Sequence, residues 1–262
     1  MPWEDEYLDG LTGGDWVSTG GVGYDAYPLD AFEERGIVLT NTPGIHQTQI
    51  AEHVFATALS FTRGLWRFRA QQEAHEWRQR SDLTDFAGDA CCVVGLGNIG
   101  EAVARRAGAF GMTVRGVKRS VEGYDGPVDE VYPSDGLRDA LDRARLVVMS
   151  LPLTDETRGT VGVDELAATT EDAILVNVGR GPTLRTDAVV AALEEGTLAA
   201  ACLDVTDPEP LPPDHPLWDR DDVLITAHSA GQTDKSTDRA VPRFVEQYDR
   251  WVAGEPLRHR IV

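Results

Sequence analysis

The chain has 262 residues, 42% of them hydrophobic and 26% charged, and can therefore bury one large core or two small ones. Acidic residues outnumber basic residues 44 to 24, which gives a formal net charge of −20 at pH 7. This balance argues against a nucleic-acid partner, because binding phosphates requires a basic face.

Lysine occurs only at Lys118 and Lys235, so the other basic residues are arginines. An acidic, lysine-poor surface stays hydrated in concentrated salt, where screening removes its self-repulsion. We therefore expect a halophilic protein. An acidic mesophilic enzyme is the alternative interpretation.

The three cysteines, Cys91, Cys92 and Cys202, stand in apolar runs and not in metal-ligand spacings. They predict small buried side chains in a reducing cytoplasm, and no metal site. The chain shows neither a signal-peptide pattern nor an apolar run as long as a membrane span. We expect a cytoplasmic protein without a membrane partner.

The first 45 residues predict a small α/β unit. A strand at 15–18 leads into the turn Gly20-Gly21-Val22-Gly23, and a helix at 28–34 precedes a strand at 37–39. The chain then enters a long predicted helix at about 47–63.

The helix at 47–63 carries apolar residues on more than one stripe, and a second helical stretch at 65–77 carries Trp66, Phe68 and Trp77. These aromatic side chains either pack into the core or form a subunit interface. A helix that is apolar on two sides needs two partners, which favours the interface.

From residue 90 to 231, predicted strands alternate with predicted helices. Apolar runs predict buried strands at 90–94, 113–117, 146–149, 174–178, 199–203 and 223–226. A helical pattern at 186–195 stops at Gly196, and another at 234–252 contains Pro242, which we expect to kink or interrupt it. The alternation predicts a doubly wound parallel sheet of the Rossmann type, with a second, smaller α/β domain.

The segment Gly95-Leu96-Gly97-Asn98-Ile99-Gly100 follows the strand at 90–94 and precedes a helical pattern at 101–110. Such a turn lets backbone amides and a helix N-terminus approach a pyrophosphate. The glycine spacing alone is a weak signal, but its place between a strand and a helix is the one that dinucleotide binding requires. We expect this turn to bind a dinucleotide.

Three ionisable residues each follow a predicted strand: Arg180, Glu209 and His228. The carboxyl ends of neighbouring parallel strands line one crevice, so these side chains can converge. Arginine can bind a carboxylate and polarise the adjacent carbonyl, and histidine can donate a proton. A carboxylate beside the histidine favours the imidazolium and orients the ring. Together these residues predict the reduction of a 2-keto acid.

At this point the chain resembles the D-isomer-specific 2-hydroxyacid dehydrogenases, the family that includes glycerate, hydroxypyruvate and glyoxylate reductases. The resemblance covers about residues 17–233. It rests on an ordered series of motifs: Gly21-Val22-Gly23-Tyr24-Asp25, Asn41-Thr42-Pro43-Gly44, Ala51-Glu52-His53, Gly95 to Gly100, Leu151-Pro152-Leu153-Thr154, Gly179-Arg180-Gly181, and the segments around Glu209 and His228.

The resemblance implies that Arg180, Glu209 and His228 are the catalytic triad, and that Arg180 and His228 also bind the substrate. It further implies that backbone amides near Val22 and Gly23 hold the substrate carboxylate. The implied cofactor contacts are the glycine turn (Gly95, Gly97, Asn98, Ile99, Gly100), Pro152 near the adenosine half, and Val178, Asp204 and Gly231 near the nicotinamide.

The resemblance also implies the assembly and the domain layout. The long helix after Thr48 builds a homodimer in this family, in agreement with its two apolar faces. Residues 1–65 and 233–262 would form a discontinuous substrate domain, and residues 66–232 the dinucleotide-binding domain.

The residues that follow the strand at 113–117 depart from an NAD-binding pattern. An acidic residue is expected about 20 positions after the glycine turn, to bind the ribose hydroxyls. This chain has Lys118-Arg119-Ser120 there, and these residues attract a 2′-phosphate that an acid would repel. We predict a preference for NADP(H) over NAD(H), with a chance basic turn as the alternative.

Further departures concern the substrate domain. Relatives carry on the order of fifty residues of strand and helix before the Gly21 segment, whereas about twenty precede it here. We therefore expect a shortened domain with an exposed sheet edge. Ser150 stands where many relatives have histidine, and Thr19 where some have arginine, which predicts an altered substrate pocket.

The sequence thus predicts an NADP(H)-dependent reductase that converts 2-keto acids into D-2-hydroxy acids, with NAD as a weaker alternative cofactor. The side of attack comes from the resemblance. A glyoxylate/hydroxypyruvate reductase would use the same mechanism on a smaller polar substrate. A catalytically weak, dinucleotide-sensing protein similar to a corepressor is the alternative from a different class.

Overall fold

The computed structural model describes residues 3–4 and 6–262. Its internal contacts divide the chain into two compact units. The larger unit is Gln47–Gly231, and the smaller unit combines the segment up to His46 with Gln232–Val262.

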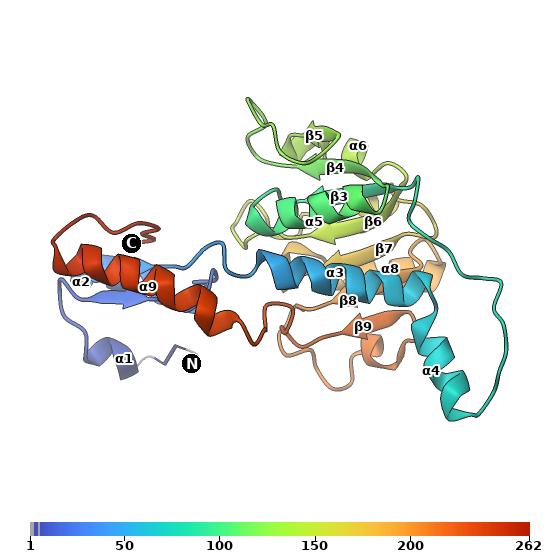
Figure 1. The fold of residues 1–262 in the computed structure, drawn as a ribbon, viewed down its shortest axis with the longest axis horizontal. Helices are drawn as coiled ribbons and strands as arrows, with labels where there is room; N and C mark the ends of the chain where they lie inside the picture. Colours follow the sequence, from blue (N-terminus) through green and yellow to red (C-terminus); the bar gives the residue numbers. More distant parts are fainter. Residues whose placement is uncertain (1–2, 5) are drawn as a thin grey trace. The chain divides into compact units, whose positions relative to one another are not determined.

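The larger unit is built on a parallel sheet whose seven strands lie in the order β5-β4-β3-β6-β7-β8-β9 (Figure 1). The sheet begins in the middle with β3 and grows outward in both directions, as in a doubly wound fold. The strands are β3 (Ala90–Val94), β4 (Thr113–Val117), β5 (Glu130–Tyr132), β6 (Ala144–Met149), β7 (Ile174–Asn177), β8 (Ala200–Leu203) and β9 (Val223–Ile225). Because all seven run parallel, their carboxyl ends lie at one edge.

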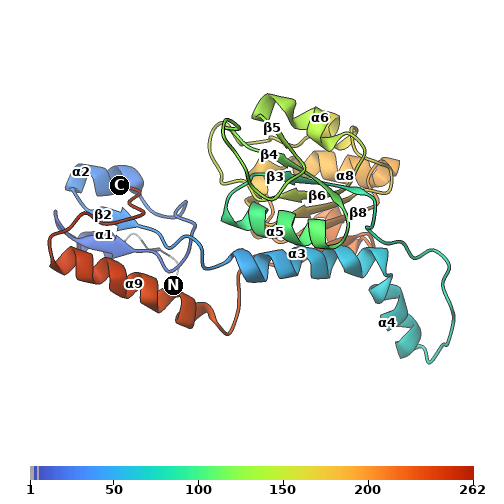
Figure 2. The same ribbon diagram turned by 45° about the horizontal axis from the view of Figure 1, so that its top comes forward.

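Helices cover both faces of this sheet (Figure 2). Cys91 and Val93 of β3 face a core shared with α3 and α5, whereas Cys92 and Val94 face a core shared with α6, α7 and α8. The strands are apolar on both sides for this reason. The helices of the unit are α3 (Gln47–Thr62), α4 (Leu65–Glu73), α5 (Asn98–Ala109), α6 (Leu137–Leu141), α7 (Val163–Leu166) and α8 (Thr186–Glu195).

The predicted Rossmann-type sheet is confirmed, and β3, β4 and α8 have the predicted bounds. Gly196 ends α8 with a left-handed φ of 72°, a conformation that suits glycine. The prediction missed β5, α6 and α7, which have only three to five residues each. Segments of that length carry too little periodicity to be recognised.

The predicted division at residues 65 and 66 differs from the division by contacts. Helix α3 lies in the larger unit, because Val54, Phe55 and Ala58 pack with α5 and the sheet in one core. A helix with a buried face belongs with the layer that it covers. The assignment of a substrate domain and a cofactor domain stays a prediction.

The aromatic residues of the second helical stretch do not fill a core. Trp66 is 48% exposed on α4, and Trp77 is 98% exposed beyond the end of that helix. The core interpretation is wrong for these two side chains. A subunit interface stays a prediction.

The smaller unit is a two-stranded parallel sheet with helices packed against it. Phe32, Ile37 and Leu39 are buried at its centre, and the C-terminal segment bonds to β2, with the Ile261 N–H donating to the Leu39 carbonyl at 2.8 Å. The elements are α1 (Glu6–Asp9), β1 (Trp16–Ser18), α2 (Leu29–Arg35), β2 (Val38–Thr40) and α9 (Ser236–Val252).

The sequence predicts that Pro242 kinks or interrupts the helix at 234–252. Helix α9 runs through Pro242, so the predicted interruption is wrong, and the kink stays a prediction. Side chains beyond the proline hold the helix in place. The Phe244 ring stacks on Trp16 of β1 with centroids 5.4 Å apart, and Gln247 accepts a hydrogen bond from the Arg258 N–H at 3.0 Å. These contacts outweigh the single backbone bond that a proline removes.

The three cysteines, Cys91, Cys92 and Cys202, belong to the two cores of the larger unit. All three thiols are buried and free, and burial raises the pKa of Cys92 and of Cys202 to about 12. In residues 3–4 and 6–262, no helix has the length and apolar character of a membrane span. The same residues contain no cluster of acidic, histidine or cysteine side chains able to hold a metal ion.

Candidate active site

The glycine turn connects β3 to the N-terminus of α5. Gly95 has a φ of +101°, and a Cβ on Gly100 would stand 1.9 Å from the Gly95 carbonyl oxygen, so both positions need glycine. Gly97 differs, because no atom of the described residues lies within 4 Å of its potential Cβ. The turn is therefore packed tightly on the protein side and open at Gly97, where a pyrophosphate can approach the amides.

Ser150 explains one of the departures from the family pattern. Its hydroxyl donates to the Gly95 carbonyl at 2.7 Å, which ties the loop after β6 to the glycine turn. Sequence reasoning noted the missing histidine but not this bond. The side chain acts on the shape of the predicted dinucleotide turn.

The basic turn after β4 begins with a lysine that is already engaged. The Lys118 ammonium donates to the Leu96 carbonyl at 2.9 Å and lies 5.3 Å from the centre of the Tyr124 ring. Arg119 is held more loosely: its side chain is 85% exposed, and its guanidinium lies 3.7 Å from a Glu156 carboxylate oxygen. Sequence reasoning missed Tyr124, which lines an open pocket with Lys118.

Arg180 lies in the turn after β7, and its neighbours dictate the shape of that turn. The buried Asn177 accepts from the Gly179 N–H at 3.0 Å and donates to the Arg180 carbonyl at 3.2 Å. A Cβ on Gly179 would meet the Leu151 carbonyl at 2.6 Å, and one on Gly181 would meet the Thr206 carbonyl at 1.8 Å. The half-buried Arg180 guanidinium donates to the Gly179 carbonyl at 2.8 Å.

His228 and Glu209 are in direct contact, as the sequence predicted. The Nδ1 atom of His228 lies 2.6 Å from Oε1 of Glu209, and both side chains are about half exposed, at 53% and 42%. The pair comes from the loops after β8 and β9, whereas Arg180 follows β7 at the same edge of the sheet. The ring nitrogen that does not face Glu209 is Nε2, which leaves it for a reacting group.

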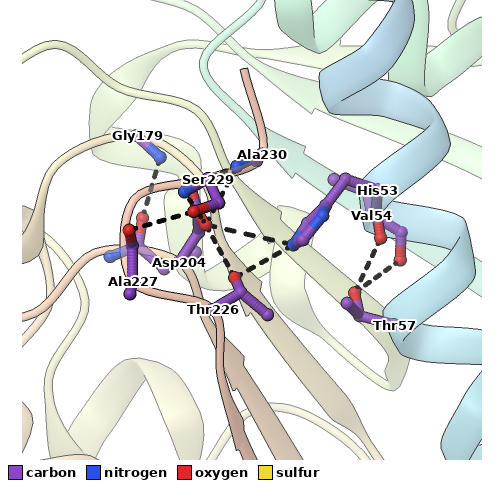
Figure 3. Close-up of polar contacts among 10 residues, drawn as sticks. His53, Val54, Thr57, Gly179, Asp204, Thr226, Ala227, Ser229 and Ala230 are labelled. Carbon is purple, nitrogen blue, oxygen red and sulfur yellow. Dashed lines mark hydrogen bonds and ion pairs between the residues drawn. The ribbon is translucent and has the colours of Figure 1, made fainter. Parts of the chain in front are cut away.

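Asp204 is the buried centre of this edge (Figure 3). Its Oδ1 accepts hydrogen bonds from the Thr226 hydroxyl at 2.6 Å, the Ser229 N–H at 2.8 Å and the Ala230 N–H at 3.0 Å. Its own carbonyl accepts from the His228 N–H at 2.6 Å. Asp204 therefore holds the loop that carries the histidine.

The remaining predicted cofactor residues lie at the same edge of the sheet. Val178 is buried after β7, Gly231 accepts from the Gln49 amide at 3.1 Å, and Pro152 is exposed after β6. Asn98 and Ile99 open α5, and Ser120 is exposed beside Arg119. These positions all follow a strand of one parallel sheet or start the helix after it, as a dinucleotide site requires.

The smaller unit holds the turn predicted to bind a carboxylate. Asn41 donates to the Val22 carbonyl at 2.9 Å, and the buried Thr19 donates to the Gly21 carbonyl at 2.7 Å. Within the described residues, the N–H groups of Val22 and Gly23 make no hydrogen bond. The turn is thus fixed through its carbonyls and leaves two amide donors available.

Residues 55–230 match the family model described as "D-isomer specific 2-hydroxyacid dehydrogenase, NAD binding domain". The chain belongs to this family. Its residues 55–230 are therefore an NAD(P)-binding domain, and the predicted family is confirmed.

Curated relatives agree with this assignment. The chain is 32% identical to a D-3-phosphoglycerate dehydrogenase of Methanocaldococcus jannaschii over 91% of its own length, but spans only 46% of that relative. It is 37% identical to a glyoxylate reductase of Aeropyrum pernix, with 81% of this chain and 65% of that relative covered. A glyoxylate/hydroxypyruvate reductase B of Pectobacterium carotovorum is 34% identical over 83% of this chain and 69% of its own length.

Solved structures of the family have the same fold. A family member from Aeromonas salmonicida superposes with a TM-score of 0.87 at 35% identity, covering 95% of this chain and 78% of that one. An NADPH-dependent glyoxylate/hydroxypyruvate reductase from Sinorhizobium meliloti, solved with NADP and sulfate, gives 0.81 at 30% identity, with coverages of 94% and 78%. The chain is shorter than these relatives, as predicted.

Proposed function

We propose that this protein is an NADPH-preferring reductase that converts a 2-keto acid into the D-2-hydroxy acid. The observation that carries the proposal is the 2.6 Å contact between His228 and Glu209. These two residues follow β9 and β8, at the same edge of the sheet as Arg180 and the glycine turn. A proton donor, a carboxylate-binding arginine and a dinucleotide turn at one edge are the parts that this reduction needs.

In this mechanism Arg180 binds the substrate. Its planar guanidinium can hold the substrate carboxylate and polarise the neighbouring keto oxygen. In the smaller unit, the N–H groups of Val22 and Gly23 are available as donors to a carboxylate. Bound NAD(P)H would supply the hydride for C2 of the substrate.

His228 completes the reaction by moving one proton. Its Nε2–H donates to the keto oxygen as C2 is reduced, so that the carbonyl becomes a hydroxyl. Glu209 holds the opposite nitrogen, which fixes the orientation of the ring. Because the His228 side chain is 53% exposed, Nε2 can regain its proton from solvent.

The preference for NADPH rests on Lys118, Arg119 and Ser120. The exposed Arg119 guanidinium can form two hydrogen bonds to a phosphate, and no acidic side chain occupies the position that binds ribose hydroxyls in NAD-specific turns. The family includes relatives solved with NADP, such as the Sinorhizobium meliloti reductase.

A small polar substrate is the preferred candidate within this reaction class. Several of the relatives are glyoxylate or glyoxylate/hydroxypyruvate reductases, including those of Aeropyrum pernix and Pectobacterium carotovorum. We therefore propose glyoxylate and hydroxypyruvate as the first substrates to assay. A homodimer formed through α3 and the exposed Trp66 of α4 is proposed with it.

The test is NADPH and NADH oxidation by the purified chain in dilute and molar salt, with glyoxylate, hydroxypyruvate, pyruvate and bulkier 2-keto acids. The proposal expects turnover, a higher kcat/KM with NADPH, and a D-configured product. Cofactor binding without turnover of any 2-keto acid would instead favour a dinucleotide-sensing protein. Higher kcat/KM with NADH would overturn the cofactor preference.

A further inference from the structure

A hydroxyl group joins helix α3 to the loop after β9. The Thr226 Oγ1 atom lies 3.0 Å from Nε2 of His53 and 2.6 Å from Oδ1 of Asp204 (Figure 3). His53 belongs to the Ala51-Glu52-His53 motif, to which the proposed mechanism assigns no role. The three side chains form a continuous path from α3 to the buried carboxylate.

Hydrogen-bond chemistry fixes the direction of this path. Asp204 Oδ1 also accepts from two backbone amides, so it is the acceptor of the Thr226 hydroxyl proton. The Thr226 oxygen then has only lone pairs to offer His53. The Nε2 atom of His53 must therefore carry a proton, which excludes the tautomer protonated on Nδ1 alone.

The loop at the end of the path has a backbone conformation that needs support. Ala227 and His228 have φ values of 45° and 53°, in the left-handed region that side chains other than glycine disfavour. Such a conformation is strained and persists only where its surroundings hold it. Asp204 supplies that support through its carboxylate and its carbonyl.

We propose that His53 and Thr226 are positioning residues, which act through Asp204 to hold the loop that presents His228. Neither belongs to the residues proposed to bind the substrate. Thr226 orients the carboxylate, and His53 orients the Thr226 hydroxyl. The Thr226 hydroxyl and two backbone amides bond to Oδ1 of Asp204. Oδ2 accepts from the Ala230 N–H at 3.1 Å and keeps a lone pair for another donor. This inference rests on the proposed function only where it predicts kinetics.

The variants are chosen to separate the hydroxyl from its surroundings. Thr226→Val removes the hydroxyl and keeps the shape, and Thr226→Ser keeps the hydroxyl. His53→Phe removes the donor and keeps a ring. Thr57→Val is the matched control, because the Thr57 hydroxyl is also buried but donates to the His53 and Val54 carbonyls of α3 and also contacts the Cys202 thiol of β8.

Kinetics supply the first measurement. We expect Thr226→Val and His53→Phe to lower kcat about tenfold with KM for the 2-keto acid within about twofold, because substrate binding groups stay in place while the proton donor is misplaced. Thr226→Ser should recover most of the loss, and Thr57→Val should stay within about twofold of the wild type. Unchanged kcat in Thr226→Val, or an equal loss in Thr57→Val, would overturn the proposal. If Thr226→Val lowers kcat but His53→Phe does not, His53 is not part of the positioning network.

Nuclear magnetic resonance supplies a measurement that needs no turnover. In ¹⁵N-histidine-labelled protein, His53 Nε2 should resonate as a protonated nitrogen, and Thr226→Val should shift the His228 ring signals and the Ser229 and Ala230 amides. Thr57→Val should leave them unmoved. An unprotonated Nε2 on His53, or an unmoved His228, would overturn the inference. If the wild type reduces no 2-keto acid but these signals behave as expected, the proposed function fails and the positioning network stands.

Discussion

The loops after β8 and β9 hold their charged residues far more firmly than the loop after β4. Asp204 is 5% exposed and binds one hydroxyl and three backbone amides, whereas Arg119 has a single ion pair and an 85% exposed side chain. In the first region, geometry is fixed by a buried anchor. In the second, a flexible charge can adjust to its ligand, because an exposed pair contributes little. Substitutions should therefore affect kcat in the first region and cofactor KM in the second.

The largest effect is expected at His228. His228→Ala removes the proposed proton donor, and general acid catalysis contributes on the order of 10²–10⁴ in rate. We expect kcat for 2-keto acid reduction to fall about a thousandfold, with NADPH affinity, measured by fluorescence titration, within about twofold. Wild-type turnover in this variant would remove His228 from the mechanism.

A smaller effect is expected at Glu209. Glu209→Gln keeps a hydrogen-bond acceptor for His228 but replaces the carboxylate that orients the ring with a neutral amide, whose hydrogen bond is weaker. We expect kcat to fall about ten- to a hundredfold, less than in His228→Ala, with KM nearly unchanged. A loss confined to KM would mean that Glu209 binds substrate instead of supporting the histidine.

The loop after β4 should respond through the cofactor. Arg119→Ala should raise the KM for NADPH about five- to tenfold and leave that for NADH unchanged, because only the 2′-phosphate is lost as a partner. Glu156→Ala, which frees Arg119 from its ion pair, should lower the KM for NADPH. The exposed Arg138→Ala is the control, and equal changes for both cofactors would contradict the assignment.

The smallest expected effect concerns the charged surface as a whole. With a net charge of −20, the folded chain should gain thermal stability when sodium chloride is raised from dilute buffer to molar concentration, by about 5 °C or more. Thermal unfolding followed by circular dichroism measures this gain. The same unfolding temperature in dilute buffer and in molar salt would favour the acidic mesophilic interpretation.

Sequence reasoning reached the sheet and the contact between His228 and Glu209, because strand order and strand ends follow from apolar runs and glycine turns. It did not reach the role of Ser150, whose hydroxyl bonds to the backbone of a neighbouring loop, or that of Asn177, whose side chain bonds to backbone groups of its own turn. The Ser150 bond depends on how close two loops come, and no spacing in the sequence records that distance. The His53 path was hidden for the same reason, since it joins residues 173 positions apart.

Two helix predictions were wrong in their extent. Pro242 predicted a kinked or interrupted helix, but α9 is not interrupted, and side chains after the proline anchor it to β1 and to the C-terminal segment. The pattern at 65–77 predicted one helix, yet α4 ends at Glu73 and leaves Trp77 outside it. For α9, packing beyond the segment, absent from the local pattern, determined the outcome.

The two glycines beside Arg180 have a mechanical consequence. Each lies against the carbonyl of a different loop, Gly179 against Leu151 and Gly181 against Thr206, with no room for even a methyl group between them. The turn that carries Arg180 therefore packs directly against the loops after β6 and β8. A side chain larger than hydrogen at either glycine would push one of these loops away from the turn that presents the guanidinium.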